Sequence, residues 1–428
     1  MLTNKNFEKF EIPKNIEQSN KIKDYNRLNS KRKYHNFTIG QSPFPVPKYI
    51  VDSLSKHANR GNYSPPLGKE ALSEKIANFY TNLFDLKINK NSLFYGLGTK
   101  NVLFMLIGLI EGTYFLPVPA WGGYEPFLNF YGRDIEKIHL KVEKDYKFDL
   151  EELEIKFKTQ KGQKVFILNN PHNPSGKVLS QKELEGLVRL FKKYNVVVFS
   201  DEIYGLTTYG KFYSLYNLYP ERTFLLGGIS KDRGAAGYRF GICVLPTEKQ
   251  KQLRDTFGKM ISNFYISLPT PIQCAAETAY EITEELQNYL EKTVYVYSYL
   301  AEKISKKLST IRGIQFKKPE SAFYITIDMN AYKSKFLQKG IIDASQLLDI
   351  LFEDPYNVAL VPGYTLGLEK NDFTFRLAYV DFDGNSILEM LSKTKSSNFY
   401  EKLENVDTFD NIYNGIEKLK LFLESLGD

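Results

Sequence analysis

The stretch GGISKDRGAAGYRFG, residues 227–241, is the part of this chain that says most about its fold and chemistry. Lys231 lies in a turn of small residues after the apolar run 223–226, which predicts a buried strand. A lysine at a strand end can be desolvated, which lowers its pKa and makes its amine nucleophilic toward a carbonyl. Arg239 follows among glycines and can hold a phosphate with a bidentate fork. The stretch therefore predicts a site for a ligand with both an aldehyde and a phosphate.

Two further apolar runs end in polar residues. Residues 196–199 precede Asp201 and Tyr204, and residues 165–168 precede NNPHNPSG, which contains Asn173. The prolines of that second segment favour extended backbone before each of them. Since open α/β sheets bind ligands at the carboxyl ends of their strands, we expect these side chains near Lys231.

The segment LFYGLGTKN, residues 93–101, followed by an apolar run, predicts a strand, a tight turn and a helix. The start of such a helix offers free N–H groups and a positive dipole end to an anion. The third glycine of the dinucleotide fingerprint is missing, so this is not a nucleotide-binding turn of that kind. Trp121, the one tryptophan of the chain, follows in the segment PAWGGY.

Arg376 lies inside FTFRLAY, residues 373–379, a strand pattern in which apolar residues alternate with others. Burying an arginine is costly unless an anion pairs with it. From the pattern alone, Arg376 is either buried with an anionic partner or exposed on an edge strand.

In this order the motifs resemble those of the class I aminotransferases of fold type I, which use pyridoxal phosphate. The resemblance extends over residues 37–380. It implies that Lys231 holds the cofactor as a Schiff base, that Asp201 pairs with the pyridine nitrogen, and that Tyr204 donates to the ring oxygen. It also implies a homodimer, in which Tyr63 of NYSPPLG reaches the phosphate of the neighbouring subunit.

The implied site can be given in full. The catalytic residues are Lys231, Asp201 and Tyr204; the cofactor is bound by these and by Gly98, Thr99, Lys100, Trp121, Asn173, Ser230, Arg239 and Tyr63; the substrate is bound by Gly40, Asn173 and Arg376; and no metal ligands are expected. One position departs from the family, because Gly228 stands where many relatives carry a phosphate-binding serine.

The alternation of strand and helix patterns over residues 59–287 predicts an α/β fold with a mainly parallel sheet. By resemblance this is the seven-stranded sheet of a large cofactor-binding domain. Residues 37–58 and 288–428 would form a smaller α+β domain, and residues 1–36 an N-terminal arm. Residues 281–308 and 412–426 read as helices, with a polar insertion at 393–405 between them.

Composition excludes several other classes of protein. With 43% hydrophobic and 25% charged residues, the chain is typical of a globular protein. The net charge of +7 is modest and dispersed, so we expect no nucleic-acid partner. No apolar run is long enough to span a membrane. The two cysteines form no C-x-x-C pair, which fits a reducing compartment. We therefore expect a cytoplasmic location.

The function predicted is transfer of an amino group between an L-amino acid and a 2-keto acid. A lyase, a synthase or an amino acid oxidase on the same scaffold remains an alternative, because the orientation of the reacting bond decides the outcome. A sensor module is disfavoured, because such regulators need a DNA-binding domain in front and about 36 leading residues leave too little room for it. A non-catalytic scaffold is disfavoured, since the polar site positions are all present. The sequence leaves the substrate open among aspartate, alanine, aromatic and less common amino acids.

Overall fold

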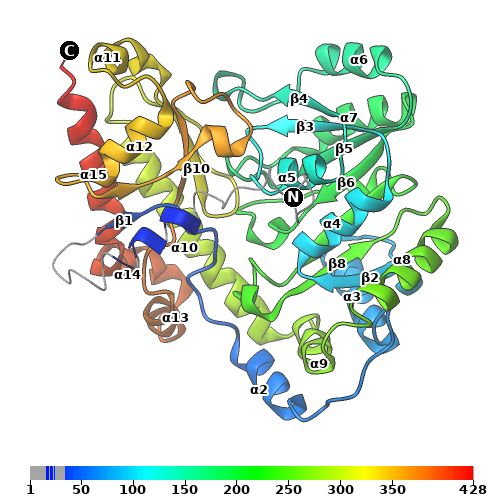
Figure 1. Ribbon diagram of the computed structural model, residues 1–428. Helices are drawn as coiled ribbons and strands as arrows, with labels where there is room; N and C mark the ends of the chain where they lie inside the picture. The colour runs from blue at the N-terminus through cyan, green and yellow to red at the C-terminus, as the bar shows by residue number, and fades with distance from the viewer. Residues whose placement is uncertain (1–15, 19, 23, 25–33, 428) are drawn as a thin grey trace.

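A seven-stranded sheet forms the centre of the larger half of the protein in the computed structural model, which describes residues 16–18, 20–22, 24 and 34–427 (Figure 1). The strand order is β2-β8-β7-β6-β5-β3-β4, and within this sheet β8 alone runs antiparallel to its neighbours. The strands are β2 (Leu93–Leu97), β3 (Thr113–Val118), β4 (Ile135–His139), β5 (Lys164–Asn169), β6 (Val197–Asp201), β7 (Thr223–Gly228) and β8 (Phe240–Val244). The predicted α/β fold with a mainly parallel sheet is confirmed.

Helices cover both faces of this sheet because its strands are apolar on both sides. One face packs against α4 (Thr99–Leu109), α5 (Tyr124–Phe130) and α8 (Gln250–Phe264). The other face packs against α3 (Glu70–Phe84), α6 (Leu150–Thr159), α7 (Gln181–Lys193) and α9 (Thr270–Ala279). Helix α2 (Lys48–His57) lies along α9.

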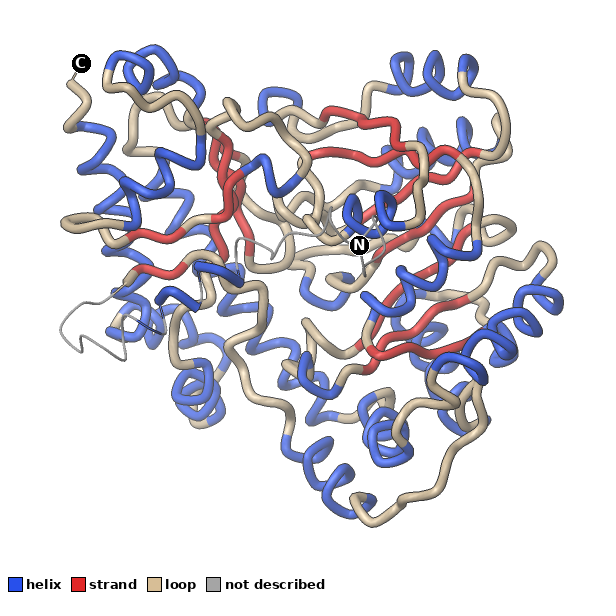
Figure 2. Tube along the Cα trace, in the orientation of Figure 1, coloured by secondary structure: helices blue, strands red, loops and turns tan. Residues whose placement is uncertain are grey.

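A second, four-stranded antiparallel sheet has the order β12-β13-β10-β9 and its own core (Figure 2). Its strands are β9 (Gln315–Phe316), β10 (Tyr324–Asp328), β12 (Val361–Pro362) and β13 (Thr374–Ala378). Its helices are α10 (Glu284–Leu308), α11 (Lys333–Gln338), α12 (Ala344–Phe352), α13 (Gly384–Ser392), α14 (Phe399–Glu404) and α15 (Asp410–Glu424). Strands β1 (His35–Asn36) and β11 (Val358–Ala359) form a separate parallel pair.

Most predicted elements are present, with ends shifted by a few residues. The two helical patterns correspond to α10 and α15. The polar insertion at 393–405 contains the whole of α14, whose Phe399 and Leu403 are buried. Most of the predicted arm lies outside the described residues, and the domain boundaries stay a prediction. Across the ranges that the structure describes, every helix is too short or too polar to cross a bilayer.

Candidate active site

The candidate site lies where the carboxyl ends of adjacent strands of the large sheet face the small sheet. Strand β5 ends at Asn169, β6 ends at Asp201, and the chain continues from β7 into Lys231. The facing wall comes from the small sheet, with Tyr324 on β10 and Arg376 on β13. A cavity of about 480 Å³ separates the two walls.

Eleven of the predicted site residues line this cavity. They are Gly40, Thr99, Lys100, Trp121, Asn173, Asp201, Tyr204, Ser230, Lys231, Arg239 and Arg376. Gly98 lies beside it as the N-cap of α4. Tyr63 does not line the cavity and is exposed on the segment before α3. Ile16 and Asn20, from the N-terminal arm, also line the cavity, which the sequence did not indicate.

Lys231 reaches into the cavity and is oriented by the backbone. Its Nζ donates to the carbonyl oxygen of Gly40 at 2.5 Å and lies 5.9 Å from the centre of the Tyr204 ring. The amine is therefore held between the two sheets, within reach of a ligand in the cavity.

Asp201 is a buried carboxylate at the floor of the cavity. Burial raises its pKa, which the hydroxyl of Tyr124, donating to Oδ2 at 2.7 Å, partly counteracts. The side chain of Asn169 fixes the backbone beneath it by donating to the carbonyl oxygen of Asp201 at 2.9 Å. Tyr124 was missed by the sequence analysis, although it stands three residues after Trp121 in the same motif.

Arg376 is a buried cation with polar but uncharged neighbours. Its Nη1 donates to Oδ1 of Asn173 and its Nη2 to the carbonyl oxygen of Thr38, each at 3.2 Å. Its Nε has no hydrogen-bond partner, and no carboxylate pairs with it among the residues that the structure describes. Because a buried guanidinium is costly without an anion, this geometry suits a ligand carboxylate.

A second cationic region lies at the start of α4. Arg239 donates from Nη2 to the carbonyl oxygen of Leu97 at 3.1 Å, which holds its guanidinium beside Gly98. Burial and the charge of Arg239 together lower the pKa of Lys100. Two cations beside a helix N-terminus form a site for an anion such as a phosphate.

The backbone leaves little room for a side chain at residue 228, where the resemblance implies a phosphate-binding serine. Gly228 pairs with Gly241 between β7 and β8, and a Cβ at residue 228 would lie 2.8 Å from the carbonyl oxygen of Phe240. The hydroxyl of Thr99 donates to the carbonyl oxygen of Gly227 at 3.0 Å. Ser230, which lines the cavity, is the nearest other hydroxyl in the sequence.

These residues fit pyridoxal phosphate in kind, and they line one cavity. The cations at α4 match its phosphate, the buried carboxylate of Asp201 its ring nitrogen, and Lys231 its aldehyde. Arg376 lies on the opposite wall.

Comparison with known proteins agrees with this geometry. Residues 32–384 match the family model described as aminotransferase class I and II. The aspartate aminotransferase of Bacillus sp. (strain YM-2) is 28% identical over 352 residues, which is 79% of this chain and 85% of that protein. The asparagine–oxo-acid transaminase of Streptococcus mutans is 27% identical over 358 residues, covering 80% of this chain and 86% of that protein.

Solved structures show the same fold. A double mutant of the aspartate aminotransferase of Thermus thermophilus superposes with a TM-score of 0.80 at 21% identity, covering 98% of this chain and 99% of the other. The fold and the family match together define the class of protein. The chain belongs to the class I and II aminotransferases, and it is an aminotransferase.

Two buried titratable groups near the site do not line the cavity. His172 is held between Ser175, at 2.7 Å, and the carbonyl oxygen of Pro119, at 3.0 Å, and burial lowers its pKa to about 4. It therefore stays neutral as a structural residue. Glu202 points away from Asp201 and accepts from the Ser200 hydroxyl at 2.7 Å. Burial raises the pKa of Glu202 to about 7.

The raised pKa of Glu202 predicts that the free energy of unfolding falls as pH rises. Below the ordinary carboxyl pKa both states hold the proton, and between that value and about 7 the folded protein alone retains it. Folding stability attributable to this group is thus lost as pH rises through about 7, by on the order of 3 kcal/mol in total.

We expect Glu202→Gln to remove that loss, because the amide keeps its neutral hydrogen bonds at every pH. Urea unfolding of the apoprotein between pH 5 and 8 measures this. Glu291→Gln, on the exposed side of α10, is the control. Parallel pH–stability curves for Glu202→Gln and wild type would contradict the prediction.

Proposed function

We propose that this aminotransferase uses pyridoxal phosphate, held by Lys231, to move the amino group of an amino acid to a keto acid. One observation carries the proposal. Lys231, Asp201 and Tyr204 from the large sheet and Arg376 from the small sheet face a single cavity. The family match supports amino-group transfer and does not favour the lyase, synthase or oxidase alternatives.

Pyridoxal phosphate, when bound, supplies an electrophilic carbon and an electron-withdrawing ring. Arg239, with the N–H groups at the start of α4, would hold its phosphate, and Trp121 would stack on its ring. Asp201, fixed by Tyr124, would keep the ring nitrogen protonated, and Tyr204 would donate to the ring oxygen.

The same residues account for the handling of the substrate. Arg376 and Asn173 would bind the α-carboxylate, which places Cα on the side of the cavity that Lys231 reaches. The Nζ of Lys231 would then take the proton from Cα and return it at the cofactor carbon, as general base and acid. The carbonyl oxygen of Gly40 keeps that nitrogen oriented.

Lys231→Ala tests the assignment directly. We expect it to lower the rate of amino-group transfer by about 10²–10⁴-fold or more, since both proton transfers lose their carrier. Borohydride reduction of the wild type, followed by peptide mass spectrometry, should find the cofactor on Lys231. Lys182→Ala, exposed on α7, is the control. Label on another lysine, or full activity of Lys231→Ala, would refute the proposal.

We further propose that the amino donor is a dicarboxylic amino acid, with aspartate as the first candidate. The relative from Bacillus sp. (strain YM-2) acts on aspartate according to its name. Lys100 supports this, because it lines the cavity near Trp121 and no carboxylate pairs with it in the described part of the chain. In this arrangement Lys100, counted above with Arg239 as a match for the phosphate, would bind the second carboxylate instead, and Arg239 and the α4 N-terminus would hold the phosphate.

Lys100→Ser separates the two roles of this lysine. If Lys100 binds a side-chain carboxylate, KM for aspartate should rise about 10- to 100-fold while KM for alanine changes little. If it binds the phosphate alone, the affinity for pyridoxal phosphate should fall and both substrates should be affected alike. The second result would leave the donor class unsupported.

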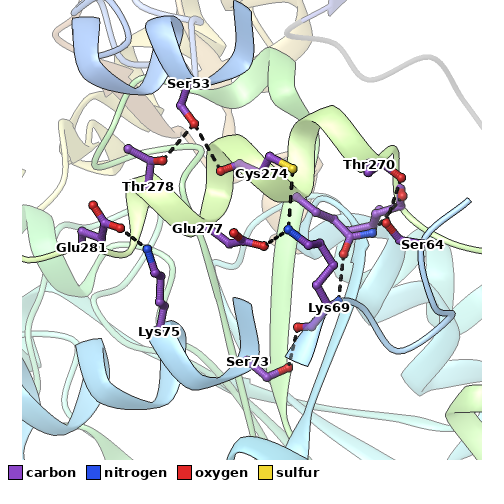
Figure 3. A network of polar contacts seen from close by, with 12 residues as sticks. Ser53, Ser64, Lys69, Ser73, Lys75, Thr270, Cys274, Glu277, Thr278 and Glu281 are labelled. Atoms are coloured by element: carbon purple, nitrogen blue, oxygen red, sulfur yellow. Dashed lines mark hydrogen bonds and ion pairs between the residues drawn. The ribbon is translucent and has the colours of Figure 1, made fainter. Parts of the chain in front are cut away.

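A homodimer is the third part of the proposal. Tyr63 is 80% exposed, although both its neighbours in the sequence are fixed to α9. The hydroxyl of Thr270, on α9, donates to the carbonyl oxygen of Asn62 and lies 2.8 Å from the hydroxyl of Ser64 (Figure 3). Lys69 continues this attachment through its contacts with Glu277 and Cys274. An exposed tyrosine on a fixed segment suits a contact with a second copy.

Exposed apolar side chains next to this segment support the same face. Phe264, at the end of α8, is 71% exposed, and Ile266 follows in a left-handed conformation at φ 65°. We expect wild type to sediment as a dimer and Phe264→Glu to shift it toward monomer, because a charge would be buried in the contact. Ile155→Glu, on α6, is the control. A monomeric wild type would refute the dimer.

A further inference from the structure

Tyr324 makes two contacts at the cavity that the roles assigned so far do not explain. It is the first residue of β10, and its hydroxyl lies 3.0 Å from the hydroxyl of Tyr204. On the other side, the guanidinium of Arg376 lies 4.5 Å from the centre of its ring. Tyr324 pairs with Ala378 in the register of β10 and β13, and Arg376 stands two residues before Ala378. Tyr324 and Arg376 are therefore diagonal neighbours on the same face of the sheet. Tyr324 thus joins the substrate-binding arginine to the cofactor-binding tyrosine.

A second path connects the same two residues. Arg376 donates from Nη1 to Oδ1 of Asn173 at 3.2 Å, and Nδ2 of Asn173 donates to the hydroxyl oxygen of Tyr204 at 3.5 Å. Arg376, Asn173, Tyr204 and Tyr324 therefore form a closed ring of contacts. All four are buried and line the cavity.

The chemistry of these groups fixes the direction of one hydrogen bond and allows two directions for the other. An amide Nδ2 can donate only, so the Tyr204 oxygen accepts from Asn173. If Tyr324 also donates to that oxygen, the single proton of Tyr204 is left for an acceptor in the cavity. The cation over the ring of Tyr324 makes its hydroxyl a stronger donor.

We propose that Tyr324 is a positioning residue, which turns the Tyr204 proton toward the ring oxygen of the cofactor and supports the guanidinium of Arg376. The inference rests on the proposed function and deepens it, because it gives the site a link between substrate carboxylate and cofactor. Gly40 leaves room for this link, since a Cβ at that position would lie 3.1 Å from the Tyr324 hydroxyl.

The first test is the pH titration of the visible absorbance of the enzyme loaded with pyridoxal phosphate. Donation by Tyr204 stabilises negative charge on the ring oxygen, so weaker donation raises the apparent pKa of that absorbance change. Tyr324→Phe removes the hydroxyl and keeps the ring. We expect it to raise the apparent pKa by about half a unit to one unit, the size expected for one hydrogen bond.

Tyr379→Phe is the matched control. Tyr379 is a buried tyrosine at the end of β13, its hydroxyl lies 2.7 Å from that of Tyr209, and it does not line the cavity. Tyr379→Phe therefore breaks a similar contact between two tyrosine hydroxyls next to the same sheet. An equal shift in Tyr379→Phe, or no shift in Tyr324→Phe, would overturn the proposal.

A double-mutant cycle tests whether Tyr324 acts through Tyr204. In the Tyr204→Phe background, Tyr324→Phe should cause no further shift of the apparent pKa, because the proton that it directs is gone. Additive shifts would overturn the proposal. A wild type without a pH-dependent visible band would overturn both this inference and the proposed function, whereas a normal wild-type titration with no effect of Tyr324→Phe overturns the inference alone.

The second contact of Tyr324 has its own measurement, the affinity of the loaded enzyme for the non-reactive dicarboxylate maleate, determined by calorimetry. Tyr324→Phe keeps the ring under Arg376 and should leave the affinity within about twofold of wild type. Tyr324→Leu removes the ring and should weaken binding about 3- to 10-fold. Equal affinities of these two variants would overturn the role assigned to the ring.

Discussion

The buried guanidinium of Arg376 is the interaction on which the rest of the site depends. It comes from the small sheet and donates to the side chain of Asn173, in the segment that follows β5 of the large sheet, and to the carbonyl oxygen of Thr38 beside β13. These neutral acceptors offset part of the free-energy cost of burying the cation. Only an anion can offset the rest of that cost. A substrate carboxylate would complete this set. Substrate binding and the contact between the two sheets are therefore served by the same residue.

The charged residues around the cavity come from different elements. Arg239 and Lys100 lie at the start of α4, Arg376 lies on the facing sheet, Lys231 follows β7, and Asp201 ends β6. Burial alone drives the Asp201 carboxyl toward its neutral form. A protonated nitrogen in the cavity would reverse that tendency by pairing with the charge. The site is thus matched to a ligand with anionic ends and a cationic centre.

The sequence was enough to predict the site residues that stand at the ends of apolar runs. Lys231 and Asp201 follow buried strands, and Arg376 interrupts an alternating one, so local pattern and family resemblance predicted their place. Tyr124 and Tyr324 were not predicted as site residues. The role of each is a contact with another site residue, and a sequence pattern does not show such contacts. With 30 tyrosines in the chain, no local pattern separates these two from tyrosines of the core. Their roles depend on how a helix and a strand lie against other parts of the site, which only the fold provides.

The glycines at 228 and 241 show how the departure from the family pattern fits the fold. A Cβ on Gly241 would lie 2.2 Å from the backbone nitrogen of Thr99, so glycine there lets the start of α4 lie directly on β8. The N–H groups of α4 are thereby brought against the sheet edge where a phosphate would bind. Losing one serine hydroxyl costs on the order of 1–3 kcal/mol for a charged acceptor. Backbone donors and Arg239, held in place by Leu97, are the groups that can make up that difference.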